Sequence, residues 1–240
     1  MLIKSLRDNK EWLWINIPKT ATTVLLKTFF PNRKYNEQQH RTYRDCVREY
    51  GVHDYSFTVV RHPVTRFMSA LNHIFSVCEC GKCKFDLTIP PTMEEVILFV
   101  EGFIEQYHKY DNYFSLLYAN NTNKLHLEFI KLIQMTFVRN IEIYNIDYCV
   151  RWAAFMPQTF MLDGARNTRI YQYEHLDECF VFIRDELGYE VQPNIRYRNY
   201  TNKLINVNVD DIKFRCLLYE LYHTDFNTFG YDYASTIKNR

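Results

Sequence analysis

The chain has 240 residues, of which 47% are hydrophobic and 24% are charged, so a disordered or fibrous protein is excluded. The formal net charge of +1 excludes nucleic-acid binding driven by overall charge. No apolar run reaches the roughly 20 residues that cross a bilayer. The seven cysteines, an odd number, favour free thiols in a reducing, cytosol-like compartment. Without internal repeats or low-complexity linkers, we expect one domain over residues 1–240.

In chain order, the apolar residues predict strands that alternate with helices. Strands are marked by runs rich in aromatic and β-branched residues, and helices by apolar residues at helical spacing. The expected elements are a strand at 12–17, a helix at 22–30, a strand at 55–60, a helix at 64–75, a loop at 78–91, helices at 92–107, 125–138 and 148–155, a strand at 168–173, and helices at 176–187 and 210–226. This alternation indicates an α/β fold with a central, mainly parallel sheet flanked by helices.

Three of these helices carry a more detailed expectation. Thr92 and Glu95 have the spacing of a capping box, which predicts a helix start at that point. Gly188 is expected to cap the C-terminal end of the helix at 176–187. The last helix is expected to turn four side chains toward the core: Ile212, Cys216, Tyr219 and Tyr222.

Residues 15–25 carry the most informative pattern, a buried strand that enters a tight turn and then a helix. The turn contains Lys19 and the hydroxyl residues Thr20, Thr22 and Thr23. Free backbone N–H groups, the positive end of the helix dipole and an ammonium group would then surround one point, which suits a phosphate or sulfate group. The Gly-Lys-Ser/Thr order of a Walker A loop is absent. The alternative is a capped helix start with a solvated lysine.

Residues 59–70 repeat the order of strand, turn and helix. Arg61 lies at the C-terminal end of the strand, where open α/β sheets bind ligands. Ser69 lies about two turns into the helix and could share an anion with Arg61. We assign Arg66 to a surface position or to a partner of the helix dipole. Two anion sites at the ends of two strands suit a ligand with two separated phosphate groups.

Together the two segments resemble the sulfotransferases that use 3′-phosphoadenosine-5′-phosphosulfate (PAPS), and the membrane-type carbohydrate branch is the most similar. Residues 18–23 resemble the 5′-phosphosulfate loop of that family, and residues 60–69 resemble its 3′-phosphate segment. Three later motifs occur in the order of that family: Met156-Pro157-Gln158, Tyr173-Glu174-His175-Leu176 and Asp225-Phe226-Asn227-Thr228-Phe229-Gly230-Tyr231. The resemblance implies a P-loop-like sulfotransferase fold.

Two positions depart from the family pattern. Ala21 stands where glycine is usual, so we expect the turn either to be strained there or to need no positive φ. Val24 stands where serine is common, which removes one possible hydroxyl contact. Neither change alters Lys19, Thr22 or Thr23.

The resemblance implies that the chain transfers a sulfuryl group from PAPS to a hydroxyl acceptor, with a carbohydrate as the expected acceptor. Lys19 would contact the oxygen that bridges the sulfuryl group and the adenosine phosphate. Arg61 and Ser69 would hold the 3′-phosphate. The other residues implied to contact PAPS are Thr20, Ala21, Thr22 and Thr23 in the turn, and Arg198 and Thr201 in a C-terminal loop that closes over the nucleotide. The scheme requires no metal.

An acceptor hydroxyl needs a base, and two histidines are candidates. His40 resembles the histidine of a Lys-His-x-Thr element that relatives carry between the two segments. His53 precedes the second strand, where other relatives carry a catalytic histidine, and Asp54 could orient its ring. An imidazole can take up a proton near neutral pH. We favour His40 and keep His53 as the alternative, while a surface histidine without function is the simpler interpretation of either.

Two further clusters have competing interpretations. Cys78, Cys80 and Cys83 suggest a zinc site, but a closed structural site needs four ligands and no fourth stands at a familiar spacing, so we favour free thiols. Five basic residues near His40 could attract an anionic acceptor or form a solvated helix face: Arg33, Lys34, Arg41, Arg44 and Arg48.

Two other functions are the alternatives to sulfuryl transfer. One is a P-loop-like nucleotide kinase or hydrolase, and the other is a non-catalytic protein that binds PAPS or its desulfonated product, 3′-phosphoadenosine-5′-phosphate (PAP). The expected partner is a hydroxylated acceptor such as a glycan, with no nucleic acid and no membrane-spanning segment. We interpret Met1 as a true start, which predicts a soluble form such as bacteria or viruses carry. A trimmed domain from the Golgi lumen is the alternative.

Overall fold

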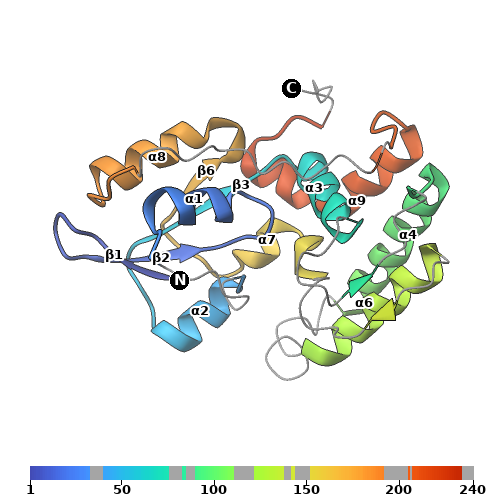
Figure 1. The fold of residues 1–240 in the computed structure, drawn as a ribbon, viewed down its shortest axis with the longest axis horizontal. Coiled ribbons are helices and arrows are strands. Elements are labelled where there is room, and N and C mark those ends of the chain that lie inside the picture. Colours follow the sequence, from blue (N-terminus) through green and yellow to red (C-terminus); the bar gives the residue numbers. More distant parts are fainter. Residues whose placement is uncertain are drawn as a thin grey trace. The chain divides into compact units, whose positions relative to one another are not determined.

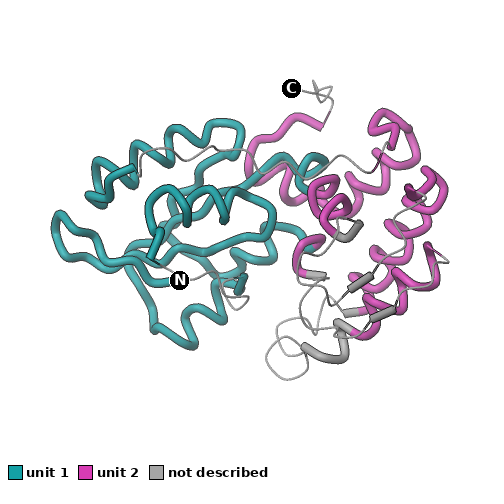
Figure 2. Tube along the Cα trace, in the orientation of Figure 1, with its two compact units in different colours: residues 1–66, 156–199 teal, residues 67–155, 200–240 magenta. Residues whose placement is uncertain are grey.

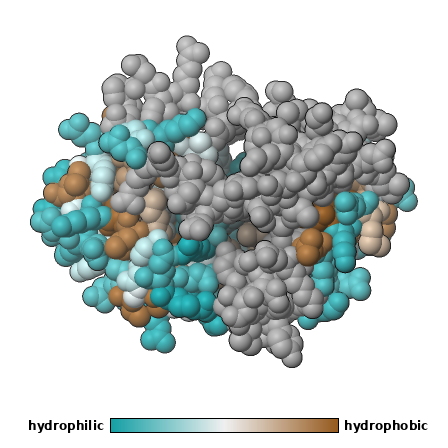
Figure 3. Space-filling model, turned by 60° about the horizontal axis from the view of Figure 1, so that its bottom comes forward, coloured by the Kyte–Doolittle hydropathy of each residue, from teal (hydrophilic) through white to brown (hydrophobic). Residues whose placement is uncertain are grey.

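The computed structural model describes residues 1–32, 40–75, 83–84, 90–110, 122–137, 142–143, 152–191, 205 and 207–233. The chain forms two compact units (Figure 2). The first combines residues 1–66 with 156–199, and the second combines 67–155 with 200–240. On the face drawn in Figure 3, the coloured residues carry hydrophobic groups in small patches between hydrophilic ones, as is usual for a globular surface.

The first unit is built on a four-stranded sheet in the order β1-β2-β3-β6 (Figure 1). Its strands are β1 (Leu2–Lys4), β2 (Glu11–Ile15), β3 (Ser56–Val60) and β6 (Thr168–Gln172). β2, β3 and β6 run parallel, and β1 pairs antiparallel with β2 at the edge. The expected α/β fold with a mainly parallel sheet is therefore confirmed, and the carboxyl ends of β2, β3 and β6 point in the same direction.

Helices cover both faces of this sheet because the side chains of β2 alternate between them. Trp12 and Trp14 belong to one core cluster with residues of α1 (Thr22–Phe29) and α8 (Leu176–Asp185). Leu13 and Ile15 belong to a second cluster with residues of α2 (Tyr43–Tyr50). The unit also contains a short helix α7 (Gln158–Met161) and a 3₁₀ turn η3 (Tyr173–His175). Every residue of β3 is buried, as expected for a central parallel strand.

The second unit is mainly helical and has an aromatic core. Its helices are α3 (Pro63–Phe75), which begins in the first unit, α4 (Met93–Tyr110), α6 (Thr122–Phe137) and α9 (Ile212–Phe229). A 3₁₀ turn η2 (Trp152–Ala154) and a small antiparallel pair, β4 (Cys83–Lys84) and β5 (Glu142–Ile143), complete its described elements. α4 packs against α6 and α9. Buried phenylalanines from several of these elements meet edge to face: Phe67, Phe99, Phe129, Phe155 and Phe214.

The helix ends confirm one of the two expected caps. The backbone N–H of Thr92 donates to Glu95 Oε2 over 2.7 Å, and the N–H of Glu95 donates to Thr92 Oγ1 over 3.2 Å, so the capping box is formed. Gly188 has φ +81°, but α8 ends at Asp185 and its C-cap is Glu186, so Gly188 lies two residues beyond the cap and the expectation that it caps the helix is wrong. The helix expected at 148–155 lies largely outside the described residues, and its last part is the turn η2.

The expected inward face of α9 is wrong at three of four positions. Ile212 is 80% exposed, and Cys216 and Tyr219 are also exposed, whereas Tyr222 is fully buried. Asp211 caps the helix and accepts a hydrogen bond from the N–H of Phe214, so Ile212 falls in the first, solvent-facing turn. The buried face instead follows another set of residues: Phe214, Leu218, Leu221, Tyr222, Asp225, Phe226 and Phe229.

Candidate anion-binding site

The turn between β2 and α1, residues 16–21, has the backbone of an anion site. Lys19 has φ +68° and Ala21 has φ +93°, and Thr20 between them does not have a positive φ. Such alternation of φ turns successive N–H groups toward one side, which forms a concavity that binds anions. Ala21 is the N-cap of α1 and provides no side-chain cap for the helix. The first N–H groups of α1 therefore add donors and the positive end of the helix dipole.

Ala21 is strained in this conformation. Its φ of +93° and ψ of 10° lie in the left-handed region, which a side chain with a Cβ rarely occupies. The sequence allowed either a strained turn at Ala21 or a turn without a positive φ there, and the structure has the strained turn. Strain of this kind is found where a particular arrangement of backbone groups is required, which fits an anion-binding turn.

Two threonine hydroxyls hold the turn from inside. Thr20 Oγ1 donates to the backbone oxygen of Ile17 over 2.8 Å, and Thr22 Oγ1 donates to Asn16 Oδ1. Both threonines are buried, so their hydroxyl protons are used within the turn. Thr23 is partly exposed in the first turn of α1. The groups best placed to donate to an anion are therefore backbone N–H groups, Thr23 and the ammonium of Lys19.

The ammonium of Lys19 lies close to a second positive charge. Burial and the nearby positive charge of Arg61 lower the pKa of its ammonium to about 8. Within the described part of the chain, no carboxylate forms an ion pair with Lys19. An anion bound in the turn would offset both effects, since opposite charge favours the protonated form of lysine.

Arg61 joins the end of β3 to this turn. Its Nη1 donates to the backbone oxygen of Lys19 over 3.4 Å, and its Nε donates to Thr65 Oγ1 over 3.2 Å. The guanidinium also lies over the ring of Tyr173, with 4.4 Å between Cζ and the ring centroid. The structure therefore brings Lys19 and Arg61 together. Ser69 lies on the part of α3 that belongs to the second unit and is partly exposed.

The backbone around Arg61 is fixed by two side chains that come from much later in the chain. Gln158 Oε1 accepts from the N–H of Arg61 over 2.9 Å, and Gln158 Nε2 donates to the backbone oxygen of Arg61 over 2.9 Å. Glu174 Oε1 accepts from the N–H of His62 over 3.0 Å. Gln158 was singled out in the sequence only as part of a motif of the family resemblance, and nothing in the sequence signalled that it contacts Arg61.

His40 lies beside the turn, in a buried position. Its Nδ1 is 3.1 Å from the backbone oxygen of Asn16, the first residue after β2. A carbonyl oxygen only accepts, so Nδ1 carries the proton of this bond and Nε2 is the nitrogen that can take up another. Asn16 is also buried, and its Nδ2 has no hydrogen-bond partner among the described residues.

His53 lies at the other end of the sheet. It precedes the amino end of β3, whereas the turn follows the carboxyl end of the parallel neighbour β2. Its Nε2 is 3.0 Å from the backbone oxygen of Tyr50, at the C-terminal end of α2. His40 therefore contacts the start of the turn that contains Lys19, whereas His53 lies at the opposite end of β3.

The assignment of Arg66 to a surface or helix-dipole role is wrong. Arg66 is fully buried, and its Nη2 donates to the backbone oxygen of Met156. A buried guanidinium needs such acceptors, because removing it from water is costly. Arg66 therefore ties the start of α3 to the segment that precedes α7.

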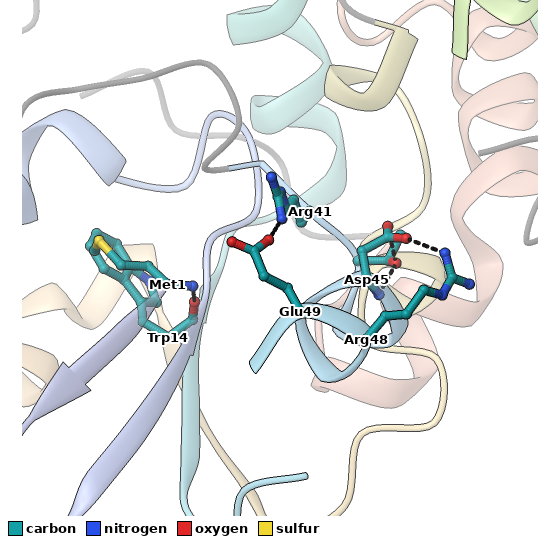
Figure 4. A network of polar contacts seen from close by, with 7 residues as sticks. Met1, Trp14, Arg41, Asp45, Arg48 and Glu49 are labelled. Carbon is teal, nitrogen blue, oxygen red and sulfur yellow. Dashed lines mark hydrogen bonds and ion pairs between the residues drawn. The ribbon is translucent and has the colours of Figure 1, made fainter. Parts of the chain in front are cut away.

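Three arginines of the basic cluster near His40 are paired with carboxylates. Figure 4 shows Arg41 against Glu49 and Arg48 against Asp45, on and next to α2. Arg44 pairs with Asp163 over 2.6 Å. Pairing reduces the net positive field of this cluster, which favours the solvated helix face over attraction of an anionic acceptor. The other two members, Arg33 and Lys34, lie outside the described residues.

Several further residues singled out in the sequence also lie outside the described residues: Arg198, Thr201, Cys78 and Cys80. Cys83 belongs to β4. Cys46, Cys179 and Cys216 are free thiols. In the part of the chain that the structure describes, no cluster of three metal-ligating side chains occurs, and no helix is long and apolar enough to cross a bilayer.

Comparisons with protein-family models, with curated proteins and with solved structures found no match to this chain.

Proposed function

We propose that this chain is a sulfotransferase that takes a sulfuryl group from PAPS and transfers it to a hydroxyl group, with a carbohydrate as the acceptor. The observation that carries the proposal is the contact between Arg61 and the backbone of Lys19, at the carboxyl ends of two adjacent parallel strands. This contact sets two cationic residues beside a helix N-terminus that has no side-chain cap. A ligand with two separated anionic groups matches that arrangement.

Each anionic group of the ligand has its own partners in the proposal. Lys19, Thr23 and the N–H groups of residues 19–23 bind the 5′-phosphosulfate, while Thr20 and Thr22 hold the turn in shape. Arg61 binds the 3′-phosphate, with Ser69, Arg198 and Thr201 as further contacts that the motif resemblance suggests. Since Lys19 and Arg61 come from separate strands, both ends of the ligand are held against one sheet edge.

PAPS supplies the activated sulfuryl group when it is bound. Lys19 stabilises the negative charge that develops on the bridging oxygen as the bond to sulfur breaks, which is the main contribution that a protein makes to this type of transfer. His40 accepts the proton of the acceptor hydroxyl at Nε2. The bond from Nδ1 to the oxygen of Asn16 orients the ring.

The P-loop-like sulfotransferase fold belongs to the same proposal. A mainly parallel sheet with helices on both faces supports it, and so does the turn between β2 and α1. The carbohydrate acceptor is supported by the order of the three later motifs that resemble the carbohydrate branch. The motif residues Gln158 and Glu174 hold the backbone around Arg61, which supports a link between those motifs and the site.

Calorimetry with PAP and with ATP tests the proposal. We expect PAP to bind with micromolar affinity and ATP to give no response under the same conditions, because ATP has no 3′-phosphate for Arg61. Incubation with radiolabelled PAPS and a panel of glycans, tyrosine peptides and phenols then tests transfer and identifies the acceptor. Equal binding of ATP and PAP, or ATP hydrolysis, would favour a kinase or hydrolase. PAP binding without transfer to any acceptor would favour a non-catalytic protein.

A further inference from the structure

The side chain of Gln158 hydrogen-bonds the backbone of Arg61 in the way that a neighbouring antiparallel strand would. The side-chain amide of Gln158 makes two hydrogen bonds of 2.9 Å to one residue, one from the N–H and one to the backbone oxygen of Arg61. In an antiparallel sheet, two facing residues exchange hydrogen bonds in the same manner. Gln158 is fully buried, so water does not compete for either bond.

The backbone of Arg61 needs this support because the sheet has ended. The last pair between β3 and β6 is Val60 with Gln172, and the last pair between β2 and β3 is Ile15 with Thr58. Arg61 lies one residue beyond the end of β3. Gln158 therefore supplies two hydrogen bonds to the backbone of a residue that lies beyond the last strand pairs.

The backbone conformation of Arg61 determines where its guanidinium lies. From the backbone that Gln158 holds, the guanidinium of Arg61 reaches the oxygen of Lys19 and lies over the ring of Tyr173. We propose that Gln158 is a positioning residue that sets the selectivity of the site for adenosine nucleotides with a 3′-phosphate. This inference rests on the proposed function, in which Arg61 binds the 3′-phosphate.

The selectivity is measured as a ratio of two affinities. PAP and 5′-AMP share the adenosine and the 5′-phosphate, and differ by the 3′-phosphate that Arg61 binds. We expect the full chain to prefer PAP over 5′-AMP by about 10- to 100-fold, the range of a charge-assisted hydrogen bond. A Gln158→Met variant, which keeps the approximate volume but loses both hydrogen bonds, should lower this preference about tenfold or more and leave 5′-AMP binding within a factor of about two.

Three further variants separate positioning from a general effect on structure. Arg61→Met should lose the same preference, and the double variant Arg61→Met with Gln158→Met should lose no more than Arg61→Met alone, because the two residues act through one contact. Asp163→Asn is the matched control, since Asp163 is close to Gln158 in sequence, is exposed and pairs only with Arg44 among the described residues. It should leave the preference unchanged. Thermal unfolding is recorded for each variant.

The outcomes are distinguishable. If the unaltered chain binds neither nucleotide, the proposed function fails. If it prefers PAP and a folded Gln158→Met protein keeps that preference, or loses PAP and 5′-AMP binding equally, the positioning role is wrong.

Should Gln158→Met not fold, Gln158→Glu, which can accept from the N–H of Arg61 but cannot donate to its oxygen, takes its place. Amide exchange in the unaltered chain gives an independent check, because the N–H of Arg61 should exchange slowly, and rapid exchange would overturn the inference.

Discussion

The guanidinium of Arg61 donates from Nη1 to the backbone oxygen of Lys19 over 3.4 Å, so the end of β3 is tied to the turn that follows β2. The acceptor is the backbone oxygen of Lys19, so the ammonium of Lys19 takes no part in this bond. The charges of Lys19 and Arg61 nonetheless lie close together. Burial and this nearby charge both lower the pKa of Lys19. A site of this kind stores repulsion that a bound anion relieves.

Replacement of Lys19 tests the charge directly. We expect Lys19→Met to lower the rate of sulfuryl transfer by at least about 100-fold, because the charge on the leaving oxygen is no longer stabilised. The measurement is single-turnover transfer of labelled sulfuryl to the best acceptor of the panel. Lys27→Met is the control, since Lys27 is an exposed lysine in the last turn of α1, the helix that follows the turn containing Lys19. A Lys19→Met protein with full activity would show that the assigned mechanism is wrong.

The affinity for PAP should depend on pH through Lys19. The pKa of Lys19 is lowered from 10.5 to about 8, so in the free protein its ammonium is charged below about pH 8 and loses its proton above that. A bound anion favours the charged form, so PAP should bind more weakly as the pH rises above about 8, and binding should take up a proton in that range. Calorimetry at several pH values, in buffers with different enthalpies of ionisation, measures both effects.

Arginine at the same position provides the comparison for this pH dependence. A guanidinium stays protonated over the whole range, so Lys19→Arg should bind PAP with a nearly constant affinity from about pH 7 to about pH 10. A flat profile for the unaltered chain, or an equally steep loss for Lys19→Arg, would assign the pH dependence to another group.

Glycine at position 21 should relieve the strain in the turn. Ala21 has φ +93°, where a Cβ costs about 1–2 kcal/mol, while glycine adds about 0.4–1 kcal/mol of chain entropy to the unfolded state. We therefore expect Ala21→Gly to raise the free energy of unfolding by about 0.5–1 kcal/mol in urea titrations. Ala165→Gly, at a loop position without a positive φ, should lower it. A loss of stability in Ala21→Gly would mean that the left-handed conformation is not the populated one.

The two histidines should differ in their effect on transfer. His40→Gln should reduce the rate by about 100-fold or more, because general base catalysis contributes at least that much. His53→Gln should stay within a few-fold of the unaltered rate, since His53 lies at the opposite end of β3. PAP binding should survive both changes. If instead His53→Gln were inactive and His40→Gln active, the base would have to be reassigned.

Much of the fold of the first unit could be predicted because its signals are local. The strands β2 and β3 are short runs of aromatic and β-branched residues, and the structure has them within two residues of the expected bounds. The meeting of Lys19 and Arg61 then follows from parallel pairing, which brings the carboxyl ends of strands to one edge. The local residue pattern and the geometry of a parallel sheet were therefore sufficient to predict that Lys19 and Arg61 lie together.

Among the elements that were not predicted, β1 and α2 were missed because both are short. β1 has only three residues, and its pairing with β2 decides its conformation. α2 is rich in charged residues, although Tyr43, Cys46 and Val47 stand at helical spacing and belong to the core cluster on that face of the sheet. A signal was present at its start, where Thr42 Oγ1 accepts from the N–H of Asp45 over 3.2 Å, and at its end, where Gly51 follows the last turn.

The role of Gln158 could not be predicted, for a different reason. It contacts Arg61 across 97 residues, and a side-chain amide that imitates a strand leaves no periodic pattern. The same applies to Arg66, whose charge suggested the surface although its guanidinium reaches the backbone oxygen of Met156 in the interior. Contacts of this kind depend on tertiary structure, which local propensity does not encode.

The first unit is assembled from two stretches of chain that are separated by the whole of residues 67–155. During synthesis β3 therefore emerges long before β6, and its fully buried side chains lack one neighbour until the later stretch leaves the ribosome. Pairing over such a separation is slow, and an open strand edge invites association with other nascent chains in the meantime. Efficient production of this protein should accordingly respond to chaperones that shield unpaired strands, and fragments that stop before residue 156 should aggregate.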